Sequence, residues 1–324
     1  MQPLVSVLLP VYNGEAYLRG AIESVLEQDY PAFELVIADN ASTDSGPSII
    51  ADYSGNERVR VFRNEKTVPR LENFNLVFKA ADPRCSWFKF VGDDDRLLPD
   101  CLKEMVSAGE EQKSAGLVCS HYYNGSELVT GVLPPGVSLV KGAEVLRRML
   151  VEPEARATIF SPASLLIKPE VYREMGGFRT DLLHADAELF YRILNKYDLA
   201  YVHRPLVQIG YHSASGQAES TARGDTFKEA YLIRYRNLKL YDQVKLKPLE
   251  VEKIKNNLVN DSFGFMLGRL LKGDFRGAWQ HLGVIPAAAL YHLPLSALYF
   301  TALALKKIIR REPVRLLTGQ KKMD

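Results

Sequence analysis

Between residues 4 and 124, short apolar runs alternate with longer segments that carry apolar residues at every third and fourth position. A continuous apolar run is typical of a strand buried on both faces, and the wider spacing is typical of a helix with one buried face. This alternation predicts an α/β fold with a doubly wound, mostly parallel sheet flanked by helices. The predicted strands are Leu4–Val11, Phe33–Asn40, Val59–Asn64, Trp87–Gly92 and Leu117–Asn124, and the predicted helices are 15–28, 42–53, 70–82 and 99–113.

The pattern changes in the second half of the chain. It is weak from residue 125 to 160, apart from a helix predicted over 142–152, and residues 162–178 predict a strand, a short helix and a Gly-Gly turn. A long amphipathic helix is predicted over Asp186–Tyr197, followed by a strand. From Asp225 onward the chain is mainly helical. We therefore expect an α/β domain over residues 1–222 and a helical C-terminal region over 223–324.

The composition is that of an ordinary globular protein. Hydrophobic residues make up 47% of the 324 residues, and the net charge of +2 gives no reason to expect a nucleic-acid partner. The three cysteines are widely spaced, so a reducing compartment is favoured over a disulfide framework. The N-terminus lacks a basic start, and its short apolar run ends at Pro10, which predicts a buried strand rather than a signal peptide. We expect a cytoplasmic protein.

Several common catalytic motifs are missing from the sequence. There is no GxGxxG or GxxxxGK[ST] loop, which disfavours a dinucleotide-dependent dehydrogenase and a P-loop NTPase. There is also no HExxH or CxxC zinc pattern and no GxSxG nucleophile elbow. The candidate chemistry therefore rests on carboxylates.

Acidic side chains follow two of the predicted strands. Asp39 and Asp44 come after the second strand, and the run Asp93–Asp95 comes after the fourth. Ligands of parallel sheets bind beyond the carboxyl ends of the strands, so these side chains are placed to meet a ligand. A carboxylate can accept hydrogen bonds from a ribose or a base, and adjacent carboxylates can hold Mg²⁺ or Mn²⁺. Taken singly, each could instead cap a turn or the helix that Pro99 opens.

Two further candidates lie later in the chain. Asp186 stands at the start of a predicted helix, where it could be a general base or an ordinary helix cap. His212 ends the last predicted strand of the α/β domain, and on its own its position favours a structural role.

The ordered series of these segments resembles family 2 glycosyltransferases. The resemblance begins with "VSVLLPVYNGEAYLRGAIESVLEQ" and "FELVIADNASTDSG", continues through "NFNLVFKAA" and "FKFVGDDDRLLPD", and ends with "GGF", "ADAEL" and "YHSAS". It covers roughly residues 4–215. Such enzymes have the GT-A fold and transfer a sugar from a nucleotide diphosphate.

The resemblance implies a role for each candidate residue. Asp186 matches the catalytic base, which takes a proton from the acceptor hydroxyl in an inverting transfer. Asp94, Asp95 and His212 match the ligands of a divalent cation, Mg²⁺ or Mn²⁺. The donor would be a nucleotide-diphosphate sugar, most often a uridine one, with guanosine and thymidine still open. The residues expected to bind it are Pro10, Tyr12, Asn13, Glu15, Asp39, Asn40, Asp44, Asn75, Asp93 and Asp94. Of these, Asp39 matches the residue that accepts a hydrogen bond from the base.

The sequence departs from the family pattern at three positions. Gly92 stands where an acid is common, Ala185 replaces the Glu of a Glu-Asp pair, and Gly210 replaces an Arg. These changes leave open a non-catalytic nucleotide-sugar-binding or scaffold protein of the same fold. A nucleotidyltransferase is a third alternative, but "PVYNGEAYLRG" does not resemble a triphosphate-binding loop.

The C-terminal region suggests a membrane surface as a partner. Residues 282–305 carry no formal charge and are followed by the basic "KKIIRREPVR". The run is long enough to span a bilayer, but Pro286, His292 and Pro294 interrupt it. We therefore expect peripheral or monotopic attachment to the cytoplasmic face, with a homodimer interface as the alternative. The acceptor is expected to be a glycan or a lipid-linked sugar of a cell-surface polysaccharide or glycolipid.

Overall fold

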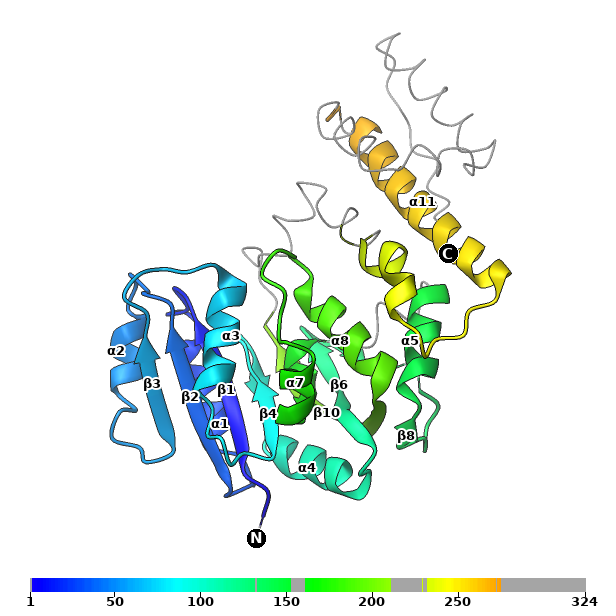
Figure 1. The fold of residues 1–324 in the computed structure, drawn as a ribbon. Helices are drawn as coiled ribbons and strands as arrows, with labels where there is room; N and C mark the ends of the chain where they lie inside the picture. Colours follow the sequence, from blue (N-terminus) through cyan, green and yellow to red (C-terminus); the bar gives the residue numbers. More distant parts are fainter. Residues whose placement is uncertain are drawn as a thin grey trace, which may run out of the picture. The chain divides into compact units, whose positions relative to one another are not determined.

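The computed structural model describes residues 2–131, 133–152, 161–210, 229, 232–271 and 273–274. The chain divides into two compact units, one made of residues 1–215 and 238–246 and the other of 216–237 and 247–324. The first unit contains the sheet and all the described candidate residues. Figure 1 shows the elements in sequence order.

The first unit is built on one mixed sheet of ten strands, with the order β3-β2-β1-β4-β9-β6-β10-β5 and with β7 and β8 at the side. Parallel pairs join β1 to β2 and β4, β2 to β3, and β6 to β10. The short β9 is antiparallel to both β4 and β6, so these two neighbours of β9 point the same way. The strands are β1 Val5–Val11, β2 Phe33–Asp39, β3 Val59–Arg63, β4 Trp87–Phe90, β5 Arg96–Leu97, β6 Ala115–Asn124, β7 Glu127–Val129, β8 Leu139–Val140, β9 Leu165–Ile167 and β10 Asp198–Ile209.

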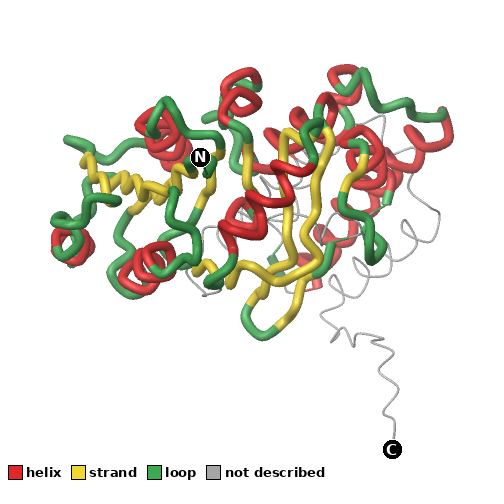
Figure 2. The backbone as a smooth tube through the Cα atoms, turned by 90° about the horizontal axis from the view of Figure 1, so that it is seen from below, coloured by secondary structure: helices red, strands yellow, loops and turns green. Residues whose placement is uncertain are grey.

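Helices cover both faces of this sheet, as Figure 2 shows. The core on one face is formed by α1 and α4 against alternate residues of the strands, including Val7 and Leu9 of β1. On the other face α3 and α7 lie together (Figure 1), where the rings of Phe78 and Tyr172 stack with centroids 4.0 Å apart. The helices of this unit are α1 Leu18–Leu26, α2 Gly46–Ala51, α3 Arg70–Ala80, α4 Cys101–Glu111, α5 Gly142–Val151, η1 Pro162–Ser164, α7 Pro169–Glu174 and α8 Ala185–Lys196.

The central strands are buried because both faces are covered. All seven residues of β1 and all seven of β2 are buried, which accounts for their continuous apolar sequences. The predicted mostly parallel sheet with flanking helices is therefore confirmed. The predicted strand, short helix and glycine turn near residue 170 are also present as β9, α7 and the left-handed Gly176 and Gly177, with φ of 76° and 73°.

One buried lysine joins the antiparallel β9 region to the parallel half of the sheet. Lys89 of β4 is completely buried, and its Nζ donates hydrogen bonds to the carbonyl oxygens of Ala163 and Leu165. Burial lowers the pKa of this amine because the charged form loses its hydration. Lys89 thus stabilises the unpredicted crossing of the chain through η1 and β9.

Two sequence expectations differ from the structure in detail. The helix expected to open at Pro99 begins at Cys101, after the two-residue strand β5, which the sequence did not predict. Asp95 is not a cap for that helix, because its carboxylate accepts N–H groups from Gly92 and Gly210.

The second unit, taken by itself, contains the long helix α11, Pro248–Leu271. The 3₁₀ helix η2, Arg236–Leu240, falls at the boundary between the units. Within the described residues, no helix combines the length and the apolar character needed to cross a bilayer. The uncharged run 282–305 and the basic segment after it lie outside the described residues.

Candidate active site

The candidate residues gather at the carboxyl edge of the parallel strands. Loops that leave β1, β2 and β4 all emerge there, because these strands are parallel neighbours. The C-terminal end of β10 reaches the same edge, where the N–H of Gly210 donates to Oδ1 of Asp95, 3.1 Å away. The structure therefore brings together the segments that carry Pro10–Glu15, Asp39–Asp44 and Asp93–Asp95.

Asp39, the last residue of β2, is held by two donors. Its Oδ1 accepts the backbone N–H of Ser42 at 3.0 Å, and its Oδ2 is bound by the guanidinium of Arg63. Arg63 ends β3 directly beside Asp39 in the parallel register. The side chain of Asp39 is only 2% exposed, whereas that of Arg63 is 47% exposed. Asp39 is thus a buried, oriented carboxylate covered by a cation.

Ser42 also ties the β1 loop to the β2 loop. Its hydroxyl accepts the N–H of Asn13 at 3.0 Å, and the side chain of Asn13 accepts the N–H of Thr43 at 2.9 Å. Asn13 has a φ of 54°, a left-handed conformation that Asn tolerates better than most residues. Tyr12 next to it leaves 51% of its surface exposed, while Pro10 is buried in β1. The exposed ring is available for stacking.

Glu15 and Asp44 bind each other's loop. The N–H of Glu15 donates to Oδ2 of Asp44, and the N–H of Ser45 donates to Oε2 of Glu15, both at 2.9 Å. The other oxygen of Asp44 accepts the N–H of Gly46 at the start of α2. Both carboxylates therefore shape the loops, and their contact with a donor remains a prediction.

Asn40 has a structural task in the fold. Its amide exchanges two hydrogen bonds with the backbone of Val68, and its oxygen also accepts from Asn64. Asn64 donates in addition to Asn73 of α3, which reaches the carbonyl of Ala38. These bonds connect the loop after β3 with the end of β2 and with α3.

Asn75 is bound to a loop 103 positions further along the chain. Its amide donates to the carbonyl of Phe178 at 2.8 Å, and its oxygen accepts from the Phe178 N–H and the Tyr172 hydroxyl. The loop that leads toward α8 is held on α3 in this way. A role of Asn75 as a donor ligand remains a prediction.

The acidic turn after β4 is the most strongly charged part of this edge. Asp95 is 7% exposed, and its two oxygens accept N–H groups from Gly92 and Gly210. Burial raises the pKa of Asp95 to about 6, and the negative charges of Asp94 and Asp93 add to this rise, while the two N–H groups oppose it. The turn therefore concentrates negative charge that a cation would relieve.

Three glycines allow other segments to approach this turn. A Cβ on Gly14 would lie 2.5 Å from Oδ2 of Asp93, and one on Gly210 would lie 2.3 Å from the carbonyl oxygen of Asp94. A Cβ on Gly92 would lie 2.7 Å from Oδ2 of Asp95. Two of the departures from the family pattern, Gly92 and Gly210, thus have a steric reason: atoms of Asp95 and Asp94 occupy the space that a side chain would need there.

The turn offers hard oxygen donors of the kind that Mg²⁺ and Mn²⁺ prefer. Among the residues that the structure describes, no group of three or more His, Cys, Asp or Glu side chains is arranged to hold a metal ion. Two carboxylates are nevertheless an ordinary protein contribution for Mg²⁺, whose other ligands are substrate phosphates and water. Asp94 and Asp95 fit that donor set, and His212 lies outside the described residues.

Asp186 lies in the first turn of α8. The helix starts at Ala185, His184 is the capping position, and Oδ1 of Asp186 accepts the N–H of Ala187 at 2.8 Å. Asp186 is therefore not the N-cap that the alternative reading required. The segment before the helix contacts the start of α3, where Arg70 donates to the carbonyl of Leu183 at 3.4 Å.

Comparison with known proteins agrees with this arrangement. Residues 6–165, which include the loops after β1, β2 and β4, match the model of glycosyl transferase family 2. This part of the chain, which holds most of the candidate site, belongs to glycosyl transferase family 2. As a family 2 glycosyltransferase it is an enzyme, as the sequence predicted.

Two bacterial relatives show how far the similarity extends. An uncharacterized glycosyltransferase of Rickettsia felis is 28% identical over 221 residues, which cover 66% of this chain and 35% of the relative. A putative teichuronic acid biosynthesis glycosyltransferase of Bacillus subtilis, TuaG, is 31% identical over 115 residues, covering 35% of this chain and 45% of the relative. The match thus spans less than half of either relative.

Two solved structures share the GT-A fold. S. aureus TarS 1–349 in complex with UDP-GlcNAc has a TM-score of 0.68 at 17% identity, over 98% of this chain and 95% of that chain. The mannosyltransferase PcManGT of Pyrobaculum calidifontis, in complex with GDP-Man and Mn²⁺, has a TM-score of 0.55 at 18% identity, over 96% and 83%. At these identities the likeness confirms the fold of the family 2 glycosyltransferase.

The sequence did not single out Arg63, Ser42 or Lys89. Arg63 had one detectable signal, since it is the last residue but one of a predicted strand, as Asp39 is of the neighbouring one, and a parallel register pairs them. Ser42 and Lys89 act through contacts across the fold that no local pattern reveals.

Proposed function

We propose that this family 2 glycosyltransferase is an inverting enzyme. It transfers a sugar from a nucleotide diphosphate to a hydroxyl of a glycan or a lipid-linked acceptor. The acidic turn Asp93–Asp95 carries this proposal, because it is held at the carboxyl edge of the sheet between the loops after β1 and β10. Negative charge collected at this place suits a cation that accompanies a diphosphate.

The donor would lie across the carboxyl edge from β2 to β4. The nucleoside end fits the region of Tyr12, Asp39 and Ser42. There the exposed ring of Tyr12 is next in sequence to Asn13, which is hydrogen-bonded to Ser42, and Ser42 is in turn bonded to Asp39. The diphosphate end fits the acidic turn, with Asp94 and Asp95 holding Mg²⁺ or Mn²⁺ and His212 as a further expected ligand. A bound divalent cation supplies positive charge that stabilises the departing diphosphate. The neighbours named with UDP-GlcNAc and with GDP-Man and Mn²⁺ support a nucleotide-sugar donor with a divalent cation.

Asp186 is proposed as the general base. Its carboxylate takes the proton of an acceptor hydroxyl, and the oxygen attacks C1 of the sugar from the face opposite the nucleotide. The bond between C1 and the diphosphate oxygen breaks in the same displacement, so the anomeric configuration inverts. A carboxylate in the first turn of α8 suits this task, since the helix holds its backbone in place.

The acceptor class and the location are proposed from a relative's name and from the C-terminal sequence. The name of the B. subtilis relative TuaG supports a cell-envelope polysaccharide as the acceptor class. Uncharged and basic C-terminal segments suggest peripheral or monotopic attachment to the cytoplasmic face of a membrane. We place these segments in a C-terminal domain of residues 223–324, which follows a catalytic domain of residues 1–222. A non-catalytic nucleotide-sugar binder is the alternative, motivated by Ala185.

A donor screen tests the proposed function. Purified full-length protein is incubated with MnCl₂ and UDP-, GDP- or dTDP-sugars, and both the melting temperature and the release of nucleoside diphosphate are measured. One donor class is expected to raise the melting temperature and to be hydrolysed or transferred. Stabilisation without any turnover, even with glycan acceptors present, would favour the non-catalytic alternative. Failure of every nucleotide sugar to bind would contradict the donor assignment.

A further inference from the structure

The polar group that a ligand meets at the β2–β3 end of the site is a guanidinium. The carboxylate of Asp39, which the family resemblance assigns to the base, is 2% exposed and lies under Arg63. The side chain of Arg63 is 47% exposed. A ligand approaching from solvent therefore reaches Arg63 first, and it reaches Asp39 only if the ion pair opens.

Arg63 is held in place from two sides. One terminal nitrogen binds Oδ2 of Asp39, and the other donates to the carbonyl oxygen of Ser42 at 2.8 Å. The backbone also fixes its position, because Arg63 pairs with Asp39 in the register of β2 and β3. A planar guanidinium fixed by two acceptors loses little freedom when it binds a third.

The guanidinium keeps unused donors. It has five N–H groups, and two of them are engaged in the described part of the chain. Ser42 also accepts the N–H of Asn13, so the fixed guanidinium belongs to the same bonded loop cluster as the residue after the exposed Tyr12. An aromatic face for stacking and a fixed donor for the edge of a base thus come from neighbouring loops.

We propose that Arg63 reads the base of the donor and that Asp39 acts through it as a positioning residue. Arg63 donates a hydrogen bond to a ring carbonyl oxygen of the base, and Asp39 orients and neutralises the guanidinium. The ligand class is a nucleoside diphosphate whose base carries such a carbonyl, as uracil, thymine and guanine do and adenine does not. This assignment rests on the proposed nucleotide-sugar function.

The proposal and the direct contact by Asp39 predict opposite effects of the same change. If Arg63 only covers Asp39, its removal uncovers the carboxylate, and nucleotide binding stays equal or becomes stronger. If Arg63 itself contacts the base, its removal weakens binding, since a hydrogen bond from a charged donor is lost.

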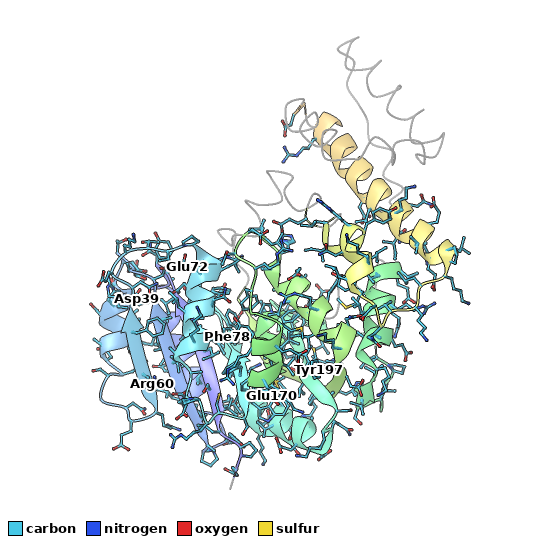
Figure 3. All side chains as sticks on the ribbon, viewed as in Figure 1. Asp39, Arg60, Glu72, Phe78, Glu170 and Tyr197 are labelled. Atoms are coloured by element: carbon cyan, nitrogen blue, oxygen red, sulfur yellow. The ribbon has the colours of Figure 1, made fainter. Side chains whose placement is uncertain are left out.

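The experiment measures dissociation constants of UDP, GDP and ADP with MnCl₂ by isothermal titration calorimetry. The full-length wild type is compared with Arg63→Gln, Arg63→Lys and Arg60→Gln. Arg60 is the matched control, because it lies on the same strand, is 54% exposed and pairs with a carboxylate, Glu34. Figure 3 shows Arg60 further along the sheet from the end that carries Asp39.

The wild type is expected to bind UDP or GDP at least tenfold more tightly than ADP. Arg63→Gln should weaken that binding by about ten- to hundredfold and leave ADP within about twofold, whereas Arg60→Gln should change neither. Arg63→Lys keeps the ion pair with Asp39 and so protects the fold, but it loses the fork and should weaken binding about tenfold. Adding Asp39→Asn to Arg63→Gln should not weaken UDP or GDP binding any further.

Three results would overturn the proposal. Unchanged or tighter UDP and GDP binding by folded Arg63→Gln or Arg63→Lys would show that Arg63 only covers Asp39. A further loss of affinity on adding Asp39→Asn to Arg63→Gln would show that Asp39 contacts the base itself. Wild-type protein that binds none of the diphosphates would remove the proposed donor function together with this inference, whereas the first two results leave that function standing.

Discussion

Gly210 is the position where a single methyl group should disturb the acidic turn most directly. A Cβ there would lie 2.3 Å from the carbonyl oxygen of Asp94 and 2.6 Å from its Cβ, and real Cβ atoms stay at 3.0 Å or more from such neighbours. Gly210→Ala must therefore move the end of β10 and the Asp94 turn apart by about 0.7 Å. A misplacement of about 1 Å in a catalytic site can cost about a hundredfold in rate.

We expect Gly210→Ala to lower kcat/KM by about ten- to hundredfold, with a loss of unfolding free energy of about 1–3 kcal/mol. The assay measures release of nucleoside diphosphate from the donor found in the screen, at saturating MnCl₂, together with the melting temperature. Gly55→Ala is the control, because a Cβ on Gly55 meets nothing within 4 Å. Wild-type kinetics for Gly210→Ala would refute the link between the Gly210 contact and the placement of Asp94.

Three further changes probe other parts of the structure. Asn75→Ala should lower the free energy of unfolding by about 2 kcal/mol, since Phe178 and Tyr172 lose their hydrogen-bond partner. Urea titration measures this loss, and Asn124→Ala, at an exposed position, is the control. Lys89→Met should flatten the rise of stability as the pH increases toward 10.5. The pKa of Lys89 is lowered from that value in the folded chain, so the unfolded chain binds the extra proton below pH 10.5 and wild-type stability increases with pH there. An equal pH slope in the variant would contradict the burial argument. EDTA should abolish turnover and MnCl₂ or MgCl₂ should restore it, whereas full activity in chelator would remove the metal role from Asp94 and Asp95.

The arrangement of the parallel strands could be predicted because their apolar runs are continuous. Both β1 and β2 are buried along their whole length, and the loops after them follow with polar residues. Because ligands bind at the carboxyl ends of the strands, the sequence also predicted Asp39 and the acidic turn as ligand-binding residues.

The antiparallel crossing and the bonding of the amides could not be predicted in the same way. Strand β9 is a three-residue segment whose place between β4 and β6 depends on Lys89 and on pairing across the whole domain. Asn75 was expected at the donor because of its motif, but its partners lie 103 positions away. Local patterns carry no information on such contacts.

The ion pair between Asp39 and Arg63 could not be predicted from the sequence either. Asp39 was expected to face a base, yet its exposure depends on Arg63, which covers it from the adjacent strand. The role of a carboxylate at a strand end thus depends on the side chain that ends the next strand.

The proposal that Asp186 is the base of an inverting transfer is tested most directly by Asp186→Asn. Sugar transfer to a cell-envelope glycan acceptor is measured beside donor affinity, with Asp181→Asn, an exposed carboxylate paired with Arg179, as the control. The account predicts that Asp186→Asn binds the donor like the wild type and transfers sugar about 10²- to 10⁴-fold more slowly, while Asp181→Asn is unchanged. Transfer by Asp186→Asn at the wild-type rate would contradict it.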